Sequence, residues 1–246
     1  MAGSGGASAG SGGTSAGTAP GSSSYPTPSV EPGNTTVSAS GDGITLQTSA
    51  SAFVPSGVAV SGTVPAGDGG AAVEIDELLT GPNPSWTAVT VLHALSGGSF
   101  AGTVHTNRTG PLTLRAVLQG SQASSASSSP PAVSITVYRR SIATLYGPGF
   151  YGHRTACGTI LRRHTIGVAN RTLPCGTPVQ IYYKGSVITV PVIDRGPYAH
   201  NANWDLTMAT ARVLGIPGTV RLGAAPVSSA SSGSGTTTGS ATPAAQ

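Results

Sequence analysis

The chain has 246 residues, only 20 of them charged, whereas glycine and proline together supply 55. This length fits one or two domains, and such a composition excludes a mainly helical enzyme core. No stretch approaches the roughly 20 consecutive apolar residues that a membrane-spanning helix needs, so the sequence predicts no direct membrane span. Short runs of Val, Ile, Leu and Ala between turn residues indicate an all-β protein with disordered additions.

The charge is unevenly distributed along the chain. Residues 1–140 hold four basic and six acidic side chains, whereas residues 141–246 hold eight basic and two acidic ones. A basic module attracts polyanions. Its basic residues are scattered, however, without a Lys/Arg run or an aromatic stacking pattern, so we do not expect nucleic-acid binding. An anionic cell wall or membrane surface would attract this half of the chain equally well.

Low-complexity segments divide the chain. Residues 1–35 are rich in Gly, Ser, Thr and Pro and have neither the basic nor the apolar region of a signal peptide. The segment is typical of a disordered tether that follows a signal or a lipid anchor. We therefore expect an extracellular or cell-wall-associated protein whose translation start is misplaced or whose export uses another route. Residues 120–132 predict a linker, and residues 227–246 predict a second disordered tail.

Residues 36–138 show alternating apolar patterning in about seven short pieces, such as "GITLQT" and "PLTLRAVL". Turn residues separate the pieces, a pattern that predicts an antiparallel β-sandwich. The segment resembles the immunoglobulin-like modules of bacterial surface proteins, without the cysteine pair of antibody domains. We expect Trp86 and Phe100 to anchor its core. No catalytic grouping is visible, which favours a spacer or adhesion-type module.

Residues 139–226 hold the distinctive motifs. "PVQIYYKGSVITVPVI" predicts a hairpin with Lys184 and Gly185 at its turn. "WDLTMATARVLG" predicts one short helix, with Asp205 or Thr207 as its N-cap and Gly215 at its end. A compact β domain of this size with a single helix suggests a barrel.

Four blocks of this segment, "LYGPGFYGHRTACG", "GVANRTLPCGTPV", "VPVIDRGPY" and "WDLTMATARVLG", stand in the order and spacing of the rare lipoprotein A family. The resemblance covers nearly all of residues 141–226. It implies a six-stranded double-psi β-barrel related to those of expansins and barwin. It also implies action on the glycan strands of bacterial peptidoglycan, which some members cut as lytic transglycosylases.

The cysteines, Cys157 and Cys175, both fall within this segment. A lone pair in an exported β domain predicts a disulfide rather than a metal site, because no cluster of His or Cys completes a coordination shell. Thiol catalysis is the alternative.

Asp194 lies in "VIDRGPY", where Gly-Pro turns the chain just after a strand, so its carboxyl should emerge at a strand end facing a groove. The resemblance implies a catalytic or substrate-binding acid here. The alternative is that Asp194 pairs with Arg195 or caps a turn. For Asp205, which precedes the predicted helix, we expect the structural role of capping that helix.

A lytic transglycosylase can work with one carboxyl that first donates a proton and then accepts one from the C6 hydroxyl of the substrate. Two positions depart from the family pattern. Thr159 stands where active members have a glutamate, and Asn170 stands where they have a histidine; neither replacement exchanges protons near neutral pH. His153 and His164 could compensate from neighbouring loops, or be plain surface residues.

A groove that holds sugar needs flat apolar faces and hydrogen-bonding groups. The expected substrate-binding residues are Tyr146, Tyr151, Thr159, Asn170, Arg195 and Tyr198, with Phe150 and Trp204 as further aromatic candidates. The alternative is that most of these aromatic residues belong to the core.

The sequence thus leaves three hypotheses open. The first is a peptidoglycan lytic transglycosylase with Asp194 as acid and base. The second is a non-catalytic module that binds or loosens the wall, and the third is a structural protein whose barrel displays the sandwich. No metal, nucleotide or organic cofactor is predicted, and the oligomeric state is not determined by the sequence.

Overall fold

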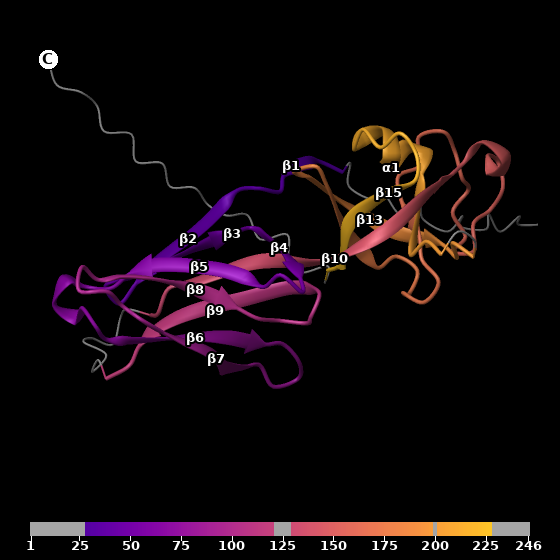
Figure 1. Cartoon of the computed structure of the whole chain (residues 1–246). Helices are drawn as coiled ribbons and strands as arrows, with labels where there is room; N and C mark the ends of the chain where they lie inside the picture. Colours follow the sequence, from indigo (N-terminus) through magenta and orange to yellow (C-terminus); the bar gives the residue numbers. More distant parts are fainter. Residues whose placement is uncertain (1–27, 121–128, 199–200, 228–246) are drawn as a thin grey trace, which may run out of the picture.

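The computed structural model describes residues 28–120, 129–198 and 201–227. It shows two β modules joined by one long strand, β10 (Ala132–Tyr146), which runs from the first module into the second (Figure 1). The predicted boundary between residues 138 and 139 therefore falls inside a continuous strand. The predicted tails and linker lie largely outside the described residues, namely at 1–27, 121–128 and 228–246.

The first module is a sandwich of two sheets. One sheet has the order β2-β3-β5-β8, and its strands are β2 (Thr36–Gly41), β3 (Ile44–Ser49), β5 (Val58–Thr63) and β8 (Ser99–Val104). The facing sheet consists of β4 (Ser51–Val54), the first part of β10, β9 (Gly110–Leu118), β6 (Ala72–Leu79) and β7 (Ser85–His93). The chain crosses between the sheets after β3, β4, β5, β7 and β8. The immunoglobulin-like assignment of this sandwich stays a prediction.

Alternation along the strands builds the sandwich core. In β3 every second residue is buried, as the period of a half-buried strand requires. Leu46, Val73 and Leu114 from both sheets are fully buried in one cluster, and Phe100 joins them as expected. The same expectation for Trp86 was wrong, because Trp86 lies on the edge strand β7, half-buried, with the Arg115 guanidinium 4.4 Å from its ring centre.

The second module is a closed six-stranded barrel. It combines the end of β10 with β11 (Val168–Ala169), β12 (Pro178–Tyr183), β13 (Ser186–Asp194), β14 (Trp204–Thr207) and β15 (Val220–Pro226). The pairings run β14-β11-β13-β12-β15-β10 and return from β10 to β14, which closes the sheet on itself. The pairs β10–β14 and β11–β13 are parallel, and the others are antiparallel. The expected hairpin is β12–β13, with Lys184 and Gly185 at its turn in the left-handed backbone region.

Only part of the segment predicted as a helix is helical, and its first four residues form a β-strand. Only α1 (Met208–Val213) is helical, and the preceding "WDLT" is β14, which pairs with both β10 and β11. Trp204 and Leu206 alternate into the barrel core, so strand pairing overrides local helix propensity. Thr207 caps the helix, its Oγ1 accepting a hydrogen bond from the Thr210 N–H at 3.1 Å. The expectation that Asp205 caps it was therefore wrong, since Asp205 lies two residues earlier in β14.

A strand inside the predicted tether belongs to the barrel. Residues Val30–Pro32 form β1, which pairs antiparallel with the start of β13. β11 covers only the far end of that edge of β13, so β1 satisfies backbone groups that the barrel leaves open. The hydrogen bond from the Gly33 N–H to the Gly185 carbonyl, 2.7 Å, extends this contact to the hairpin turn.

None of the helices in the described part of the chain has the length and apolar character needed to cross a bilayer. Within the same residues, no three side chains of His, Cys, Asp or Glu are grouped in a way that could hold a metal ion.

Candidate active site at the end of the barrel

Asp194 is the last residue of β13. Its Oδ1 accepts hydrogen bonds from the backbone N–H groups of Ala156, at 2.9 Å, and of Arg195, at 2.8 Å. Backbone donors aimed at a carboxylate compensate its charge and fix its direction. The described residues contain no salt bridge to Asp194, so the Asp194–Arg195 ion pair considered from the sequence is not formed.

A register shift places Asp194 beside a second acid. Val168 of β11 pairs with Val192, but Ala169, the next residue of β11, pairs with Asp194 rather than with Ile193. Such irregularities re-aim side chains and are common next to active sites. Ala169 also pairs with Asp205 on its other side, in β14. The two acids thus flank one small residue, about two strand spacings or about 10 Å apart between Cα atoms.

Asp205 lies in a setting that disfavours its charge. Burial raises the pKa of its carboxyl above the ordinary value of 3.8, the Thr144 hydroxyl opposes this with a hydrogen bond, and the negative charge of Asp194 raises the pKa further. Thr144 is the partner of Asp205 in the neighbouring strand β10. The Oδ1 of Asp205 is buried and has no hydrogen-bond partner among the described residues. Asp205 is therefore a carboxyl of raised pKa that lies near an acid whose Oδ1 accepts two backbone N–H donors.

Tyr146 completes this group. It lies two residues after Thr144 on β10 and is paired with Thr207 of β14. Burial raises the pKa of its phenol above 10.0, and the charges of Asp194 and then Asp205 add to the effect. Its hydroxyl is also buried without a partner in the described part of the chain. Two polar atoms near the acids thus have hydrogen-bonding capacity left for a ligand.

The disulfide holds the loops around Asp194. Cys157 and Cys175 are bonded, with their Cα atoms 5.6 Å apart, as predicted. Ala156, next to Cys157, donates to Asp194, and the Arg195 guanidinium lies 3.3 Å from the Cys175 Sγ. The bond therefore joins the loop that supplies the donor to the loop that precedes β12.

Asn170 and Arg195 serve the local backbone. The Asn170 Oδ1 accepts from the N–H groups of Thr172 and Leu173, at 3.1 and 2.9 Å, and so caps a turn. The backbone N–H of Asn170 donates to the backbone carbonyl of Asp194 at 3.1 Å. The backbone carbonyl of Asn170 accepts a hydrogen bond from Arg195 Nη1 at 3.2 Å. Both residues lie next to Asp194 as expected, but these side-chain atoms already have protein partners.

Thr159 lies in the loop that carries Ala156, held by hydrogen bonds to Thr155 in both directions. His153 and His164 are exposed, and neither has a hydrogen bond to Asp194 or Asp205 in the residues that the structure describes.

The aromatic candidates divide by exposure. Tyr198 is 79% exposed and Phe150 is 59% exposed, with the Phe150 ring centre 6.3 Å from that of Tyr146. Tyr151 is half-buried, and the Arg163 guanidinium lies 5.5 Å from its ring centre. Trp204 is 6% exposed and belongs to the barrel core, so its expected place in the groove was wrong.

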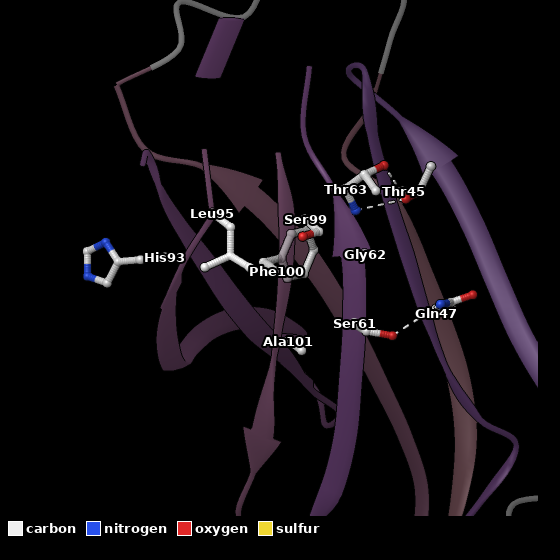
Figure 2. Close-up of a pocket in the computed structure, with 10 residues that line it drawn as sticks. All are labelled: Thr45, Gln47, Ser61, Gly62, Thr63, His93, Leu95, Ser99, Phe100 and Ala101. Carbon is white, nitrogen blue, oxygen red and sulfur yellow. Dashed lines mark hydrogen bonds between the residues drawn. The ribbon is translucent and has the colours of Figure 1, made fainter. Parts of the chain in front are cut away.

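The hollow with the larger volume lies on the sandwich and not beside Asp194. A hollow of about 640 Å³ lies on the sandwich, between the outer faces of β3, β5 and β8 (Figure 2). Its hydroxyl and amide groups bond to one another, through Thr45 with Thr63 at 2.8 Å and Gln47 with Ser61 at 3.2 Å. His93 stands apart from the other side chains in Figure 2. We therefore place the candidate site at Asp194, where polar groups are left unpaired, rather than in this hollow.

The fold and the site together define a class: a closed β-barrel with two neighbouring carboxyls and a buried tyrosine at one end. Comparison with known proteins agrees with this class. Residues 139–229 match the model of the family described as lytic transglycolase. The barrel is thus similar to the double-psi β-barrels of that family.

Individual relatives match over the same part of the chain. A probable endolytic peptidoglycan transglycosylase RlpA of Synechocystis is 39% identical over 87 residues, which are 35% of this chain and 27% of that protein. The probable RlpA of Aquifex aeolicus is 38% identical, over 32% of this chain and 36% of that protein. The endolytic peptidoglycan transglycosylase RlpA of Campylobacter jejuni is 32% identical, over 40% of this chain and 35% of that protein.

The chain thus spans about a third of the length of these relatives. Among solved structures, the Streptomyces papain inhibitor is 27% identical and is matched over 94% of its chain and 37% of this one, with a TM-score of 0.32. A TM-score of this size does not establish a common fold.

Proposed function

We propose that this chain acts outside the cell, or in the cell wall, as a lytic transglycosylase that cuts peptidoglycan glycan strands, with Asp194 as acid and base. The observation that carries the proposal is the placement of Asp194 and Asp205 on either side of Ala169, in a barrel similar to those of peptidoglycan transglycosylases.

The pair suits this reaction because the reaction needs only one proton, and Asp205, a carboxyl whose pKa is raised by burial, lies near the acid that faces substrate. In the forward step, the protonated pair gives that proton to the glycosidic oxygen as the bond from C1 to this oxygen breaks. The ionised pair then takes the proton of the C6 hydroxyl as its oxygen bonds to C1. The glycan is cut, a 1,6-anhydro end forms, and the pair recovers its proton. No water is consumed, so no second group is needed to activate one.

The two acids have different parts in this scheme. Asp194 lies at the strand end, beside the loops that carry the exposed rings of Phe150 and Tyr198, and is the carboxyl that faces substrate. Asp205 is a positioning residue that lies beside Asp194 across Ala169, and burial followed by the charge of Asp194 raises the pKa of its carboxyl. This arrangement reduces the difficulty posed by Thr159 and Asn170, since the second acid is supplied by β14 rather than by either of those positions.

A specific observation favours the second function, a wall-binding module that does not cut. The Asn170 amide oxygen is occupied by its own turn, and no imidazole contacts either acid in the described residues. Phe150 and Tyr198 still offer exposed flat faces on which sugar rings can stack. In this alternative Asp194 and Arg195 hold the glycan without cleaving it.

The sandwich fits the role of an immunoglobulin-like spacer, because its strands cross repeatedly between two sheets and its two buried acids, Asp76 and Glu77, are each paired with an arginine. It would hold the barrel at a distance from the point where the protein is anchored.

The experiment that tests the proposal incubates the full chain with peptide-stripped peptidoglycan and analyses soluble fragments by mass spectrometry. We expect 1,6-anhydro sugars with the native chain and none with Asp194→Asn. Release that persists in Asp194→Asn would show that another group does the chemistry. If nothing is released but the native chain sediments with the glycan, the binding function is correct; if the chain does neither, the barrel has a structural role.

A further inference from the structure

A second hollow, of about 530 Å³, lies where the two modules join. Phe53 of β4 lines it from the sandwich, and Tyr182, Arg221 and Gly223 line it from the barrel. Lys184, at the turn before β13, is also part of its lining. Asp194 lies at the other end of β13, eight residue steps or about 26 Å along the strand from Ser186. The hollow is therefore separate from the carboxyl pair and lies at the opposite end of the barrel.

Strand register explains how the hollow forms. Arg140, Gly223 and Tyr182 lie in one row across β10, β15 and β12. Gly223 in the middle has no side chain, and a Cβ there would come within 2.7 Å of the Phe53 ring. The Phe53 ring occupies this space and meets Tyr182 edge to face, with 5.0 Å between ring centres. The floor is thus aromatic, and both modules are needed to build it.

The rim is positively charged. Arg140, Lys184 and Arg221 are all exposed, and no carboxylate is among the residues that line the hollow. The two salt bridges in the described residues are both in the sandwich and involve other arginines. Instead, the Arg140 guanidinium lies 4.4 Å from the Phe53 ring centre, and the Lys184 ammonium lies 5.4 Å from that of Tyr183. Ring faces orient these cations without neutralising them.

Two of the cations are close together. Arg140 is opposite Gly223, and Arg221 is two residues from Gly223 on the same strand, which makes Arg140 and Arg221 diagonal neighbours. The Cα atoms of diagonal neighbours across a ladder lie about 7–8 Å apart. Side chains that leave the same face at this spacing bring their like charges near each other, and an anion bound between them relieves the repulsion.

We propose that this hollow binds an anionic polysaccharide, a sugar chain that carries carboxylate or phosphate groups. Arg140, Arg221 and Lys184 supply charge for successive anionic groups, and the half-buried Phe53 and Tyr182 supply apolar contact beside these cations that does not require a free ring face. Single-stranded nucleic acid is a poorer fit, since its bases need freely exposed rings and here Phe53 and Tyr182 pack against each other. The site goes beyond the proposed function, and it stands whether or not the barrel cuts glycan.

The test measures binding of the full chain by calorimetry at low salt. The probes are an oligogalacturonate, which carries carboxylates, a phosphodiester-linked polysaccharide, and neutral dextran as reference. The double variant K184Q/R221Q removes two exposed charges from the rim. The control R162Q/R212Q removes two exposed charges elsewhere on the barrel. Thermal unfolding of both variants verifies that each is folded.

We expect K184Q/R221Q to bind the anionic probes about 10-fold more weakly and the control to change by less than about 3-fold. The carboxylate and phosphodiester arms show which anionic group is preferred. Equal losses in both variants would overturn the proposal, because they would reflect net charge alone. Equal binding of dextran, or tighter binding of oligonucleotides or anionic lipid vesicles than of either anionic glycan, would also overturn it.

Glycan cleavage separates this proposal from the previous one. K184Q/R221Q should release anhydro sugars from soluble peptide-free glycan at the native rate, because neither residue lies near Asp194. If no form of the protein cleaves glycan, the calorimetric comparison still decides whether the hollow binds anionic polysaccharide.

Discussion

The buried acids of the sandwich and the half-buried acids of the barrel have opposite surroundings. In the sandwich, each of the two acids forms a hydrogen-bonded ion pair with an arginine. Asp76 lies 2.8 Å from Arg115 Nε, and Glu77 lies 2.6 Å from Arg108 Nη1. In the barrel, Asp194 and Asp205 have no such cation in the described residues and lie near each other instead. One Asp76 oxygen is also unpaired, but the other is held by Arg115.

On the proposed function, this difference separates structural acids from catalytic and positioning ones. A buried carboxylate paired with an arginine stabilises its fold and has little capacity left for chemistry. A carboxyl kept beside a like charge costs stability, and such groups cluster at functional sites. The sandwich is thus the internal reference against which the site in the barrel can be tested.

The largest contrast should come from removing one acid of each kind. Asp194→Asn should lower the release of anhydro sugars by at least about 100-fold, because a proton-transferring group contributes this much. Asp76→Asn should leave specific activity within about 2-fold while it lowers the midpoint of urea unfolding. The comparison fails if both variants lose activity in proportion to their loss of stability.

Reduction of the disulfide should affect only the barrel. Closing the loop between Cys157 and Cys175 stabilises by about 3 kcal/mol in the chain-entropy view, and reduction also loosens the Ala156 donor to Asp194. Urea unfolding of the full chain with and without reductant, followed by amide hydrogen exchange, measures this. Loss of protection in β12 and β13 with β3 and β9 unchanged is expected. Equal loss in both modules would mean that they unfold as one unit.

Unpairing a sandwich acid should have a smaller but clear cost. Arg115→Met leaves the nearly buried Asp76 carboxylate without its cation and should reduce the free energy of unfolding by about 2 kcal/mol. Arg108→Met should cost less than about 1 kcal/mol, because the Arg108 side chain is 55% exposed. Urea unfolding ranks the two variants, and the reverse order would contradict the structural role given to Asp76.

A small effect on stability should come from Asp205→Asn, and its size depends on pH. The folded chain binds the Asp205 proton more tightly than the unfolded chain, because the folded pKa is raised above 3.8. The contribution of Asp205 to stability is therefore complete below about pH 4 and is lost as pH rises through the raised pKa. Asparagine does not ionise.

Toward neutral pH, the free energy of unfolding of the variant should therefore exceed that of the native chain by about 1 kcal/mol. This difference should disappear in acid. Melting temperatures at several pH values measure this, with Asp68→Asn, at the end of the short 3-10 helix Ala66–Asp68 in the sandwich, as a control that stays parallel to the native chain. A constant difference at all pH values would argue against a raised pKa at Asp205.

Local patterns predicted local structure well. The Lys184-Gly185 turn and the strands on either side of it follow from residues adjacent in sequence, and the cysteine pair needs only two positions to meet. The helix was half predicted, because "WDLT" carries both a cap signal and an alternating apolar pattern. Pairing of β14 with β10 and β11, which lie far away in the sequence, decided between them.

The site was predicted in part for the same reason. Asp194 at a strand end follows from "DRGP", but its neighbour Asp205 depends on Ala169 lying between them and on a one-residue shift in β13. No local signal encodes that shift. The only trace in the sequence is that Asp205 alternates with the apolar residues Trp204 and Leu206, which indicates a strand whose acid faces away from the core.

The strand β10 has a mechanical consequence. Its 15 residues extend over about 50 Å and form part of a sheet in both modules. Rotation of one module relative to the other would break the hydrogen bonds that pair β10 with β4 and with β15. It would also break the pairing of β1 with β13. The two modules should therefore move as one body, and a force applied to the sandwich should displace Asp194 together with the barrel.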